Sequence, residues 1–290
     1  VRHDGGTFVL RMEDLDGGRT SVDFARQIIN DLKWLGIDWD EGPDIGGPHA
    51  PYDQSERIVF YQEAFERLDH EGWLYPCFCS RKELRAVASA PHGLSSLGPA
   101  YPGTCRHLTP AERTEKAKRK SPSFRFVMPD RPITFEDLVV GKRAYPAGFG
   151  GDFIVKRADG LFSYQLAVMI DDALMGMTDV LRGNDLLDST PWQVLLYEAF
   201  GLPTPRFAHV PLLYGPDGKR LSKQHESQTL ASLRTRGTTP EQLVGCLAYL
   251  TGLIDKPESV KANELISEFD LDKIPKKPIV MSETLFFGRC

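Results

Sequence analysis

DFIVKRADGLFSYQLAVMIDDALMGMTDVLRGNDLLDSTPWQ, residues 152–193, is the stretch that decides the predicted fold. A β-type run, Phe153-Ile154-Val155, opens it and is followed by a tight turn, Ala158-Asp159-Gly160. A second β-type run, residues 177–181, ends in Arg182-Gly183-Asn184-Asp185. Strands that end in charged or glycine-containing turns are typical of an open α/β sheet, in which ligands lie at the carboxyl ends of the strands. The stretch therefore favours an α/β fold with a ligand cleft at that edge.

Three charged residues stand at the ends of the apolar and β-type runs of this stretch. The apolar run from Tyr164 to Ile170 stops at Asp171 and Asp172, and Arg182 follows the second β-type run. An arginine at the end of a strand can bind a carboxylate or a phosphate through two parallel hydrogen bonds. The alternative is that all three residues are only solvated ends of strands, and this stretch alone leaves both interpretations open.

Composition limits the class of protein. The 290 residues are 41% hydrophobic and 26% charged, which is ordinary for a soluble globular protein of one large domain or two to three smaller units. No apolar run approaches the roughly 20 residues of a membrane span, and no signal peptide opens the chain, so we expect a cytoplasmic protein without a membrane partner. The net charge of −5 argues against a broadly basic nucleic-acid coat but leaves room for a local basic groove.

Hydrophobic periodicity predicts two helices near the start of the chain. Residues 7–12 are expected to form a strand that runs into Glu13-Asp14-Leu15-Asp16. One helix then begins after Thr20 as N-cap and ends at Gly36, and another runs from about Ser55 to Gly72. Their apolar residues are expected to pack in the core, namely Ile28, Ile29, Leu32 and Leu35 in the first helix and Ile58, Tyr61, Phe65 and Leu68 in the second.

Shorter elements are predicted further along the chain. Strands are expected at 124–127, 133–135 and 207–213, and a helix at 191–200 that ends before a glycine. A last helix begins at Thr239-Pro240, with Thr239 as its cap and with Leu243, Leu247 and Leu250 on one face.

A cysteine cluster is the strongest metal signal. Cys77 and Cys79 are separated by one residue, Cys105 lies downstream, and Tyr101 and His107 stand beside it. Thiolates at about 2.3 Å around a tetrahedral zinc need such a knuckle and a second loop to close the site. Three free cysteines in an irregular segment are the alternative. The fourth ligand is open, because His107 is chemically the easier choice while Tyr101 is a rarer kind of ligand.

Two further groups of residues point to substrates. The loop Arg220-Leu221-Ser222-Lys223-Gln224 offers backbone amides, a hydroxyl and a lysine, which can surround a polyphosphate, although a basic surface loop is a common alternative. Glu13 can bind an ammonium group, Arg182 can bind a carboxylate, and Tyr164 offers a hydroxyl. Together these three side chains point to an amino acid substrate. We find no Ser/His/Asp arrangement that suggests a protein nucleophile.

Four motifs in order resemble the catalytic half of the glutamyl-tRNA synthetases, which are class I aminoacyl-tRNA synthetases. They are Arg11–Asp16, Leu35–Pro43, the 152–193 stretch and Arg220–Gln224, and the resemblance covers most of residues 7–252. We expect no anticodon-binding domain after the C-terminal helices, and the chain carries the cysteine knuckle, as in the glutamyl-queuosine tRNA(Asp) synthetase branch. This resemblance implies a Rossmann-type parallel sheet with a zinc-containing insertion and a short C-terminal helical subdomain.

The same resemblance implies a reaction and its partners. Members of this branch activate L-glutamate with ATP, used with Mg²⁺, and attach it to queuosine in the anticodon loop of tRNA(Asp). Carried over by motif, Glu13, Tyr164 and Arg182 would bind glutamate, the 220–224 loop would bind ATP, and Ser222 and Lys223 would act in catalysis. Cys77, Cys79, Tyr101 and Cys105 would hold Zn²⁺, with His107 as a rival because full-length relatives use a Cys-x-His pair. We expect a monomer.

The sequence departs from the family pattern at three points. The first strand and the HIGH-type helix, which bind ATP and part of the glutamate, are expected to be missing before Val1; Arg220 replaces the usual lysine, and Gln224 replaces the final serine. Two other functions therefore remain open. One is a truncated glutamyl-tRNA synthetase that charges tRNA 3′ ends, and the other is an inactive RNA-binding relative.

Four units are expected along the chain. Residues 1–75 would form the first half of the catalytic domain and 76–150 the zinc-binding insertion. Residues 151–230 would form the second catalytic half with the ATP loop, and 231–290 a helical C-terminal subdomain.

Overall fold

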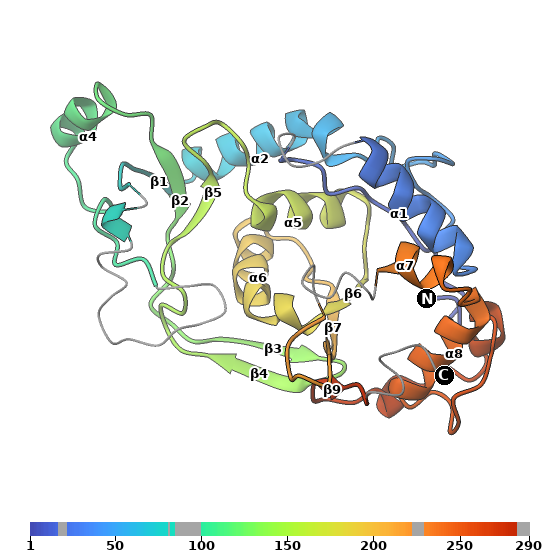
Figure 1. The fold of residues 1–290 in the computed structure, drawn as a ribbon. Helices are drawn as coiled ribbons and strands as arrows, with labels where there is room; N and C mark the ends of the chain where they lie inside the picture. Colours follow the sequence, from blue (N-terminus) through green and yellow to red (C-terminus); the bar gives the residue numbers. More distant parts are fainter. Residues whose placement is uncertain (17–21, 81, 85–99, 222–228, 283–290) are drawn as a thin grey trace.

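A computed structural model of the chain describes residues 1–16, 22–80, 82–84, 100–221 and 229–282 (Figure 1). Its α-helices are α1 (Val22–Trp34), α2 (Ile58–His70), α4 (Pro110–Ala117), α5 (Tyr164–Leu174), α6 (Thr190–Ala199), α7 (Leu230–Thr235) and α8 (Pro240–Leu250). Its strands are β1 (Leu74–Cys77), β2 (Ser123–Phe126), β3 (Ile133–Asp137), β4 (Gly141–Tyr145), β5 (Phe153–Lys156), β6 (Asp179–Gly183), β7 (Arg206–Val210), β8 (Leu213–Tyr214) and β9 (Ile279–Val280). Short 3₁₀ helices are η1 (Gln54–Glu56), η2 (Asn184–Ser189), η4 (Ala262–Leu265) and η5 (Leu271–Lys273).

The larger sheet carries the predicted α/β character. Its strand order is β4-β3-β7-β6, in which β7 pairs in parallel with both β3 and β6 while β4 is an antiparallel edge strand. The α/β prediction is thus confirmed, and the parallel part of the sheet comprises β3, β7 and β6. A short parallel pair, β8 and β9, lies outside this sheet.

The opening stretch is divided between two sheets, which corrects the expectation of one sheet. The strand at Phe153 is β5, and it pairs antiparallel with β2, which in turn pairs antiparallel with β1. β6 instead pairs with β7 in the larger sheet. The strands β1, β2 and β5 thus form a second, three-stranded sheet. Because β5 lies beyond residue 150 and β2 lies within the predicted insertion, the hydrogen bonds of this sheet connect the insertion to the following segment.

The apolar run between these strands is helix α5, not a strand. Ser163 caps it by accepting a hydrogen bond from the backbone N–H of Leu166. Leu166, Ala167 and Met169 are completely buried, because α5 packs between α2 and α6 at the centre of the molecule (Figure 1). A helix that is apolar on nearly every face belongs in a core. The acidic pair at its C-terminal half is therefore buried and does not mark a strand end.

The predicted core faces are confirmed only in part. In α2, Tyr61, Phe65 and Leu68 are buried. In α1, by contrast, Ile28 is 50% exposed and no described residue is fully buried, so the expected core packing of this helix is wrong for much of its length. The proposed cap Thr20 lies outside the described residues.

Two other expectations differ from the structure. Residues 7–12 form only isolated bridges, Val9 with Glu41 and Met12 with Asp53, in place of a strand. Helix α8 begins as predicted, with Thr239 and Gln242 in a capping box and a proline in the first turn. Its buried face, however, contains Val244 and Ala248, whereas Leu247 is exposed.

Candidate active site

Arg182 lies near the carboxyl end of β6, where an open α/β sheet places its ligands. Its Nε donates to Nε2 of His209 at 3.0 Å, and its Nη2 donates to the hydroxyl of Thr190 at 2.8 Å. The guanidinium carbon lies 5.2 Å from the ring centre of Phe207. The remaining nitrogen, Nη1, is shielded from solvent and has no hydrogen-bond partner among the described residues. An orphaned guanidinium N–H of this kind suits a carboxylate or phosphate ligand.

Glu13 and Tyr164 lie within electrostatic reach of one another, with Arg182 close to both. The side chain of Glu13 is 46% exposed, yet the surrounding protein excludes enough solvent to raise the pKa of its carboxyl, against the opposing charges of Arg11 and Arg182. Burial also raises the pKa of Tyr164, the first residue of α5, and the charge of Glu13 adds to this effect. An accessible group with a desolvated carboxyl is typical of the wall of a concave site.

A buried ionic network holds the segment that carries Glu13. The carboxylate of Asp171 is completely buried and accepts hydrogen bonds from Nε2 of Gln54 at 2.8 Å, Nε of Arg57 at 2.6 Å and the hydroxyl of Tyr61 at 2.7 Å. Arg11, two residues before Glu13, pairs with Asp172 at 2.9 Å and lies 3.5 Å from Asp171. The network therefore connects the segment that carries Glu13 to helices α2 and α5.

The start of the predicted ATP loop is tied to the end of β6. Nη2 of Arg220 donates to Oδ2 of Asp185 at 2.7 Å, and the N–H of Leu221 donates to the carbonyl of Leu213 at 2.9 Å. Because Asp185 follows Arg182 by three residues, these bonds bring the beginning of the loop beside the predicted glutamate site. Ser222, Lys223 and Gln224 lie outside the described residues.

The cysteine knuckle forms a second, separate cluster. The Sγ atoms of Cys77, Cys79 and Cys105 all lie within 4.8 Å of one another, with 3.6 Å between those of Cys79 and Cys105. The hydroxyl of Tyr101 is 3.4 Å from Sγ of Cys77 and 3.5 Å from Sγ of Cys79. Ligands at about 2.3 Å from a tetrahedral zinc are about 3.7 Å apart, so these spacings fit the ion. His107 is exposed and lies outside the cluster.

An arginine lies beside Tyr101, and the pKa values of two cysteines of the cluster are shifted. The guanidinium carbon of Arg125 lies 3.7 Å from the ring centre of Tyr101. Burial alone would raise the pKa of Cys77, but hydrogen bonds to Tyr101 and Arg125 lower it below its ordinary value. Burial raises the pKa of Cys79 to about 11. A divalent metal would favour the thiolate form of cysteine ligands.

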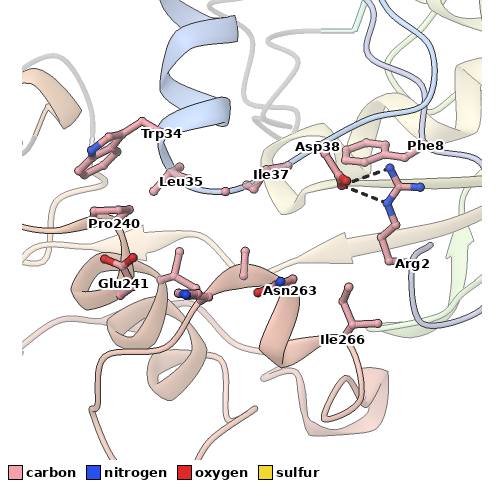
Figure 2. A pocket seen from close by; sticks show the side chains of 14 residues that line it. Arg2, Phe8, Trp34, Leu35, Ile37, Asp38, Pro240, Glu241, Asn263 and Ile266 are labelled. Atoms are coloured by element: carbon pink, nitrogen blue, oxygen red, sulfur yellow. Dashed lines mark hydrogen bonds and ion pairs between the residues drawn. The ribbon is translucent and has the colours of Figure 1, made fainter.

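A groove of about 490 Å³ lies elsewhere, between the end of α1, the first residues of the chain, α8 and η4 (Figure 2). At one side of it, Arg2 pairs with Asp38 at 3.2 Å, and it also pairs with Asp40 at 2.6 Å. None of the predicted site residues lines this groove. In the described part of the chain, no helix combines the length and the apolar character needed to cross a bilayer.

Sequence reasoning missed the residues that hold Arg182 and Glu13 in place. His209 is completely buried in β7, and its Nδ1 lies 2.5 Å from Oδ2 of Asp137 on β3. A histidine inside the apolar run 207–213 was the available signal, because a polar ring in a buried strand needs partners. Nothing local in the sequence indicates Asp137 as that partner.

The comparison with known families decides the class of protein. A model of the class I tRNA synthetases (E and Q), catalytic domain, matches residues 1–285. The chain belongs to this family.

Individual synthetases resemble the chain over nearly its whole length. The glutamyl-Q tRNA(Asp) synthetase of Symbiobacterium thermophilum is 60% identical over 98% of this chain and 89% of its own length. The enzyme of the same name from Nitratidesulfovibrio vulgaris is 44% identical over 97% and 87%. A glutamate–tRNA ligase of a Sulfurihydrogenibium species is 39% identical, and the match covers 98% of this chain but 59% of that protein.

The fold of a solved synthetase agrees with these matches. The glutamate–tRNA ligase of Elizabethkingia meningosepticum, determined in complex with its amino acid, superposes with a TM-score of 0.83 and 32% identity, covering 98% of this chain and 62% of that one. The class I synthetase fold with mixed α/β sheets is thereby confirmed.

Proposed function

We propose that this synthetase activates L-glutamate with ATP and transfers the glutamyl group to queuosine in the anticodon loop of tRNA(Asp). The observation that carries the proposal is the geometry of Arg182, whose guanidinium is held at the end of β6 with Nη1 unpaired. Two relatives that cover nearly the whole chain bear the name glutamyl-Q tRNA(Asp) synthetase, which supports this choice of product.

Glutamate presents one ammonium and two carboxylates, and the site offers matching groups. Arg182 would bind the side-chain carboxylate, since the α-carboxylate must stay free to react, and Glu13 would bind the ammonium. The hydroxyl of Tyr164 would add a hydrogen bond between them. Two charged contacts at fixed places would select an acidic amino acid of one length.

The reaction needs positioning and charge stabilisation more than a protein nucleophile. An oxygen of the α-carboxylate attacks the α-phosphorus of ATP, and the bond to the bridging oxygen breaks to release pyrophosphate. Negative charge grows on the departing pyrophosphate, where Mg²⁺ and the loop that contains Ser222 and Lys223 would stabilise it. A hydroxyl of queuosine then attacks the carbonyl carbon of glutamyl-adenylate and AMP leaves.

We also propose that Cys77, Cys79, Cys105 and Tyr101 bind one Zn²⁺. The interatomic spacings support this set over one that contains His107. Zinc at this position would be structural, because four protein ligands leave no open position for substrate. It would join β1 to the loop at residues 101–105.

The division into units at residues 75, 150 and 230 belongs to the proposal as well. So do the monomeric state and the cytoplasmic location. Size-exclusion chromatography with light scattering measures the oligomeric state directly, and a mass of one chain is the expected result.

The decisive experiment measures the two steps separately. Glutamate-dependent ATP–pyrophosphate exchange should occur and should exceed exchange with aspartate or glutamine. Labelled glutamate should then be transferred to tRNA(Asp) that contains queuosine and not to the same tRNA without it. Transfer to the 3′ end of tRNA(Glu) would instead identify a glutamate–tRNA ligase, and absence of exchange would indicate an inactive relative.

A matched pair of arginine variants tests whether Arg182 binds glutamate. Arg182→Ala should lower the kcat/KM for glutamate in the exchange reaction by about 100-fold, since a charged hydrogen-bonded pair is lost. Arg206→Ala removes an arginine from the adjacent strand, where it pairs with Asp179 at the surface, and should change exchange by less than about twofold. Equal effects of the two changes would contradict the role of Arg182.

A further inference from the structure

His209 joins two strands through its ring. It lies beside Arg182 in the parallel pairing of β6 and β7, and its side chain is completely buried. Nε2 lies 3.0 Å from Nε of Arg182, and Nδ1 lies 2.5 Å from Oδ2 of Asp137 on β3. One carboxylate, one imidazole and one guanidinium therefore form a continuous line across three neighbouring strands.

The protonation state of the ring follows from its neighbours. Arginine stays protonated and its Nε–H can only donate, so Nε2 of His209 must be an acceptor. The ring proton is therefore on Nδ1 and is donated to Asp137. Burial lowers the pKa of His209, which agrees with a neutral ring.

Asp137 is held in a single orientation by the backbone. Its Oδ1 accepts hydrogen bonds from the N–H groups of Val139 at 3.0 Å, Val140 at 2.9 Å and His209 at 3.3 Å. Only Oδ2 is left for the imidazole. The carboxylate can therefore specify the Nδ1–H tautomer without any change of its own position.

The guanidinium of Arg182 is restrained on two nitrogens and one face. His209 accepts from Nε, Thr190 accepts from Nη2, and Phe207 packs against the plane. Phe207 and His209 share one face of β7, because side chains alternate along a strand. These contacts leave Nη1 as the nitrogen without a partner among the described residues.

We propose that His209 and Asp137 are positioning residues for glutamate binding: Asp137 sets the tautomer of His209, and His209 aims the Arg182 guanidinium at the substrate carboxylate. This inference rests on the proposed function of Arg182 as the glutamate-binding arginine. Neither residue touches the substrate. Their effect is on the affinity for glutamate and not on the affinity for ATP.

Asp137→Asn tests the tautomer with little change in shape. The amide oxygen of the new side chain stays with the three backbone donors, so its NH₂ faces Nδ1 of His209. Nδ1 must then accept a hydrogen bond, so the ring proton moves to Nε2. The Nε2–H of His209 and the Nε–H of Arg182 then face each other as two donors without an acceptor. The KM for glutamate should rise about tenfold or more in pyrophosphate exchange, while the KM for ATP changes by less than about twofold.

Two replacements of His209 separate its two nitrogens. His209→Gln places an amide oxygen near the position of Nε2 and can still accept from Arg182, so its KM for glutamate should stay within about threefold of the original. His209→Asn reaches only the position of Nδ1 and leaves Nε of Arg182 without an acceptor, so its KM for glutamate should rise about tenfold or more. Thermal unfolding of both variants and of the original chain shows whether either change lowers the stability of the folded protein.

The tautomer can also be observed directly. In ¹⁵N spectra of histidine-labelled protein, the signals absent from His209→Gln belong to His209. They should show a protonated Nδ1 and an unprotonated Nε2 in the original chain, and the reverse in Asp137→Asn. A protonated Nε2 in the original chain overturns the proposal.

Failure of this inference differs from failure of the proposed function. Absence of glutamate-dependent exchange in the original chain contradicts the proposed function. If the original chain shows normal exchange and Asp137→Asn and His209→Asn leave the KM for glutamate unchanged, only the positioning role is contradicted. An equal rise of the KM values for glutamate and ATP in both His209 variants, which would indicate a merely structural role, contradicts it as well.

Discussion

Asp171 lies at the centre of the buried ionic network that joins α2, α5 and the N-terminal segment. Its completely buried carboxylate accepts from Gln54, Arg57 and Tyr61 and lies 3.5 Å from Nε of Arg11. These partners come from η1, α2, the residue between them and the N-terminal segment, so the network joins separate parts of the chain. A buried charge stabilises a structure only when its partners remain, which makes the removal of one partner costly.

The substitution Asp171→Asn tests this network. It leaves Arg57 buried without a full counter-charge, and we expect the free energy of unfolding to fall by about 3–5 kcal/mol. Urea unfolding followed by circular dichroism measures the loss. Asp69→Asn, an exposed change on α2, should alter stability by less than about 0.5 kcal/mol. A similar small effect at Asp171 would show that the network carries little of the stability.

His209 predicts a pH dependence of stability. Burial lowers its pKa in the folded protein below the ordinary value of 6.5, so the unfolded chain binds a proton first as the pH falls through that value. The stability from this group is therefore lost with decreasing pH, at a rate approaching about 1.4 kcal/mol per pH unit until the lower folded pKa is reached. The pKa of Asp137 is held below its ordinary range by its hydrogen bonds, against burial, so its own contribution is lost only at lower pH.

Chemical unfolding at about pH 7.5 and about pH 5.5 measures this effect. The original chain should lose more stability between the two conditions than His209→Gln, which cannot be protonated there. An equal loss in both proteins would mean that His209 has no lowered pKa.

At the scale of elements, the segment just before β5 contacts a residue of the proposed metal site. Gly151 has a positive φ of 69° and forms a bridge with Tyr101. A Cβ at this position would lie 2.5 Å from the backbone nitrogen and oxygen of Tyr101. The glycine therefore permits the close contact that places the tyrosine hydroxyl beside the three sulfur atoms.

A pair of glycine variants separates this contact from simple backbone strain. Gly148 has a similar φ of 70° but no atom near its absent Cβ. Both Gly148→Ala and Gly151→Ala should cost about 1 kcal/mol or more through the left-handed backbone. Only Gly151→Ala should also weaken zinc binding, by about tenfold or more, measured by competition with a chromophoric chelator. Equal zinc affinity of the two variants would contradict this role of Gly151.

At the scale of the whole molecule, the predicted insertion is joined to the rest of the protein by strand pairing, buried apolar side chains and polar contacts. Phe126, Met128 and Ile133 lie in the main core, and β3 pairs with β7. Asp152 accepts from the hydroxyl of Tyr75 at 2.6 Å and from the N–H of Met128 at 2.7 Å. The separate cluster at the proposed metal site has four buried residues, Tyr75 and the proposed ligands Cys77, Tyr101 and Cys105, which is small for a stable unit. A structural metal commonly supplies the stability that so small a core lacks.

Removal of the metal should therefore destabilise the protein measurably. We expect about one zinc per chain by elemental analysis, and a chelator should lower the Tm by about 2–4 °C for each kcal/mol lost. Added zinc should restore the Tm. Cys79→Ser should start from the lower Tm and should not respond to the chelator. A chelator-insensitive Tm in the original chain would contradict a structural zinc.

The sequence by itself determined the local elements and their ends. Thr239 and Pro240 placed the start of α8, and Gly72 and Gly201 placed the ends of α2 and α6, because these signals act within one turn; α2 itself begins at Ile58, three residues after the predicted Ser55. It also placed Arg182 near the end of a strand and Cys77 beside Cys79, since one intervening residue restricts how far apart two side chains can lie. The family followed from motifs that each fit into a few consecutive residues.

Only the tertiary structure decided which elements are partners. The pairing of β5 with β2, the buried carboxylate of Asp171 and the line from Asp137 through His209 to Arg182 join residues that are 27 to 117 positions apart. Burial and hydrogen bonding across such distances depend on the whole packed arrangement, which hydrophobic periodicity does not encode. The exposed face of α1 shows the same limit, because an amphipathic pattern indicates a helix but not what covers it.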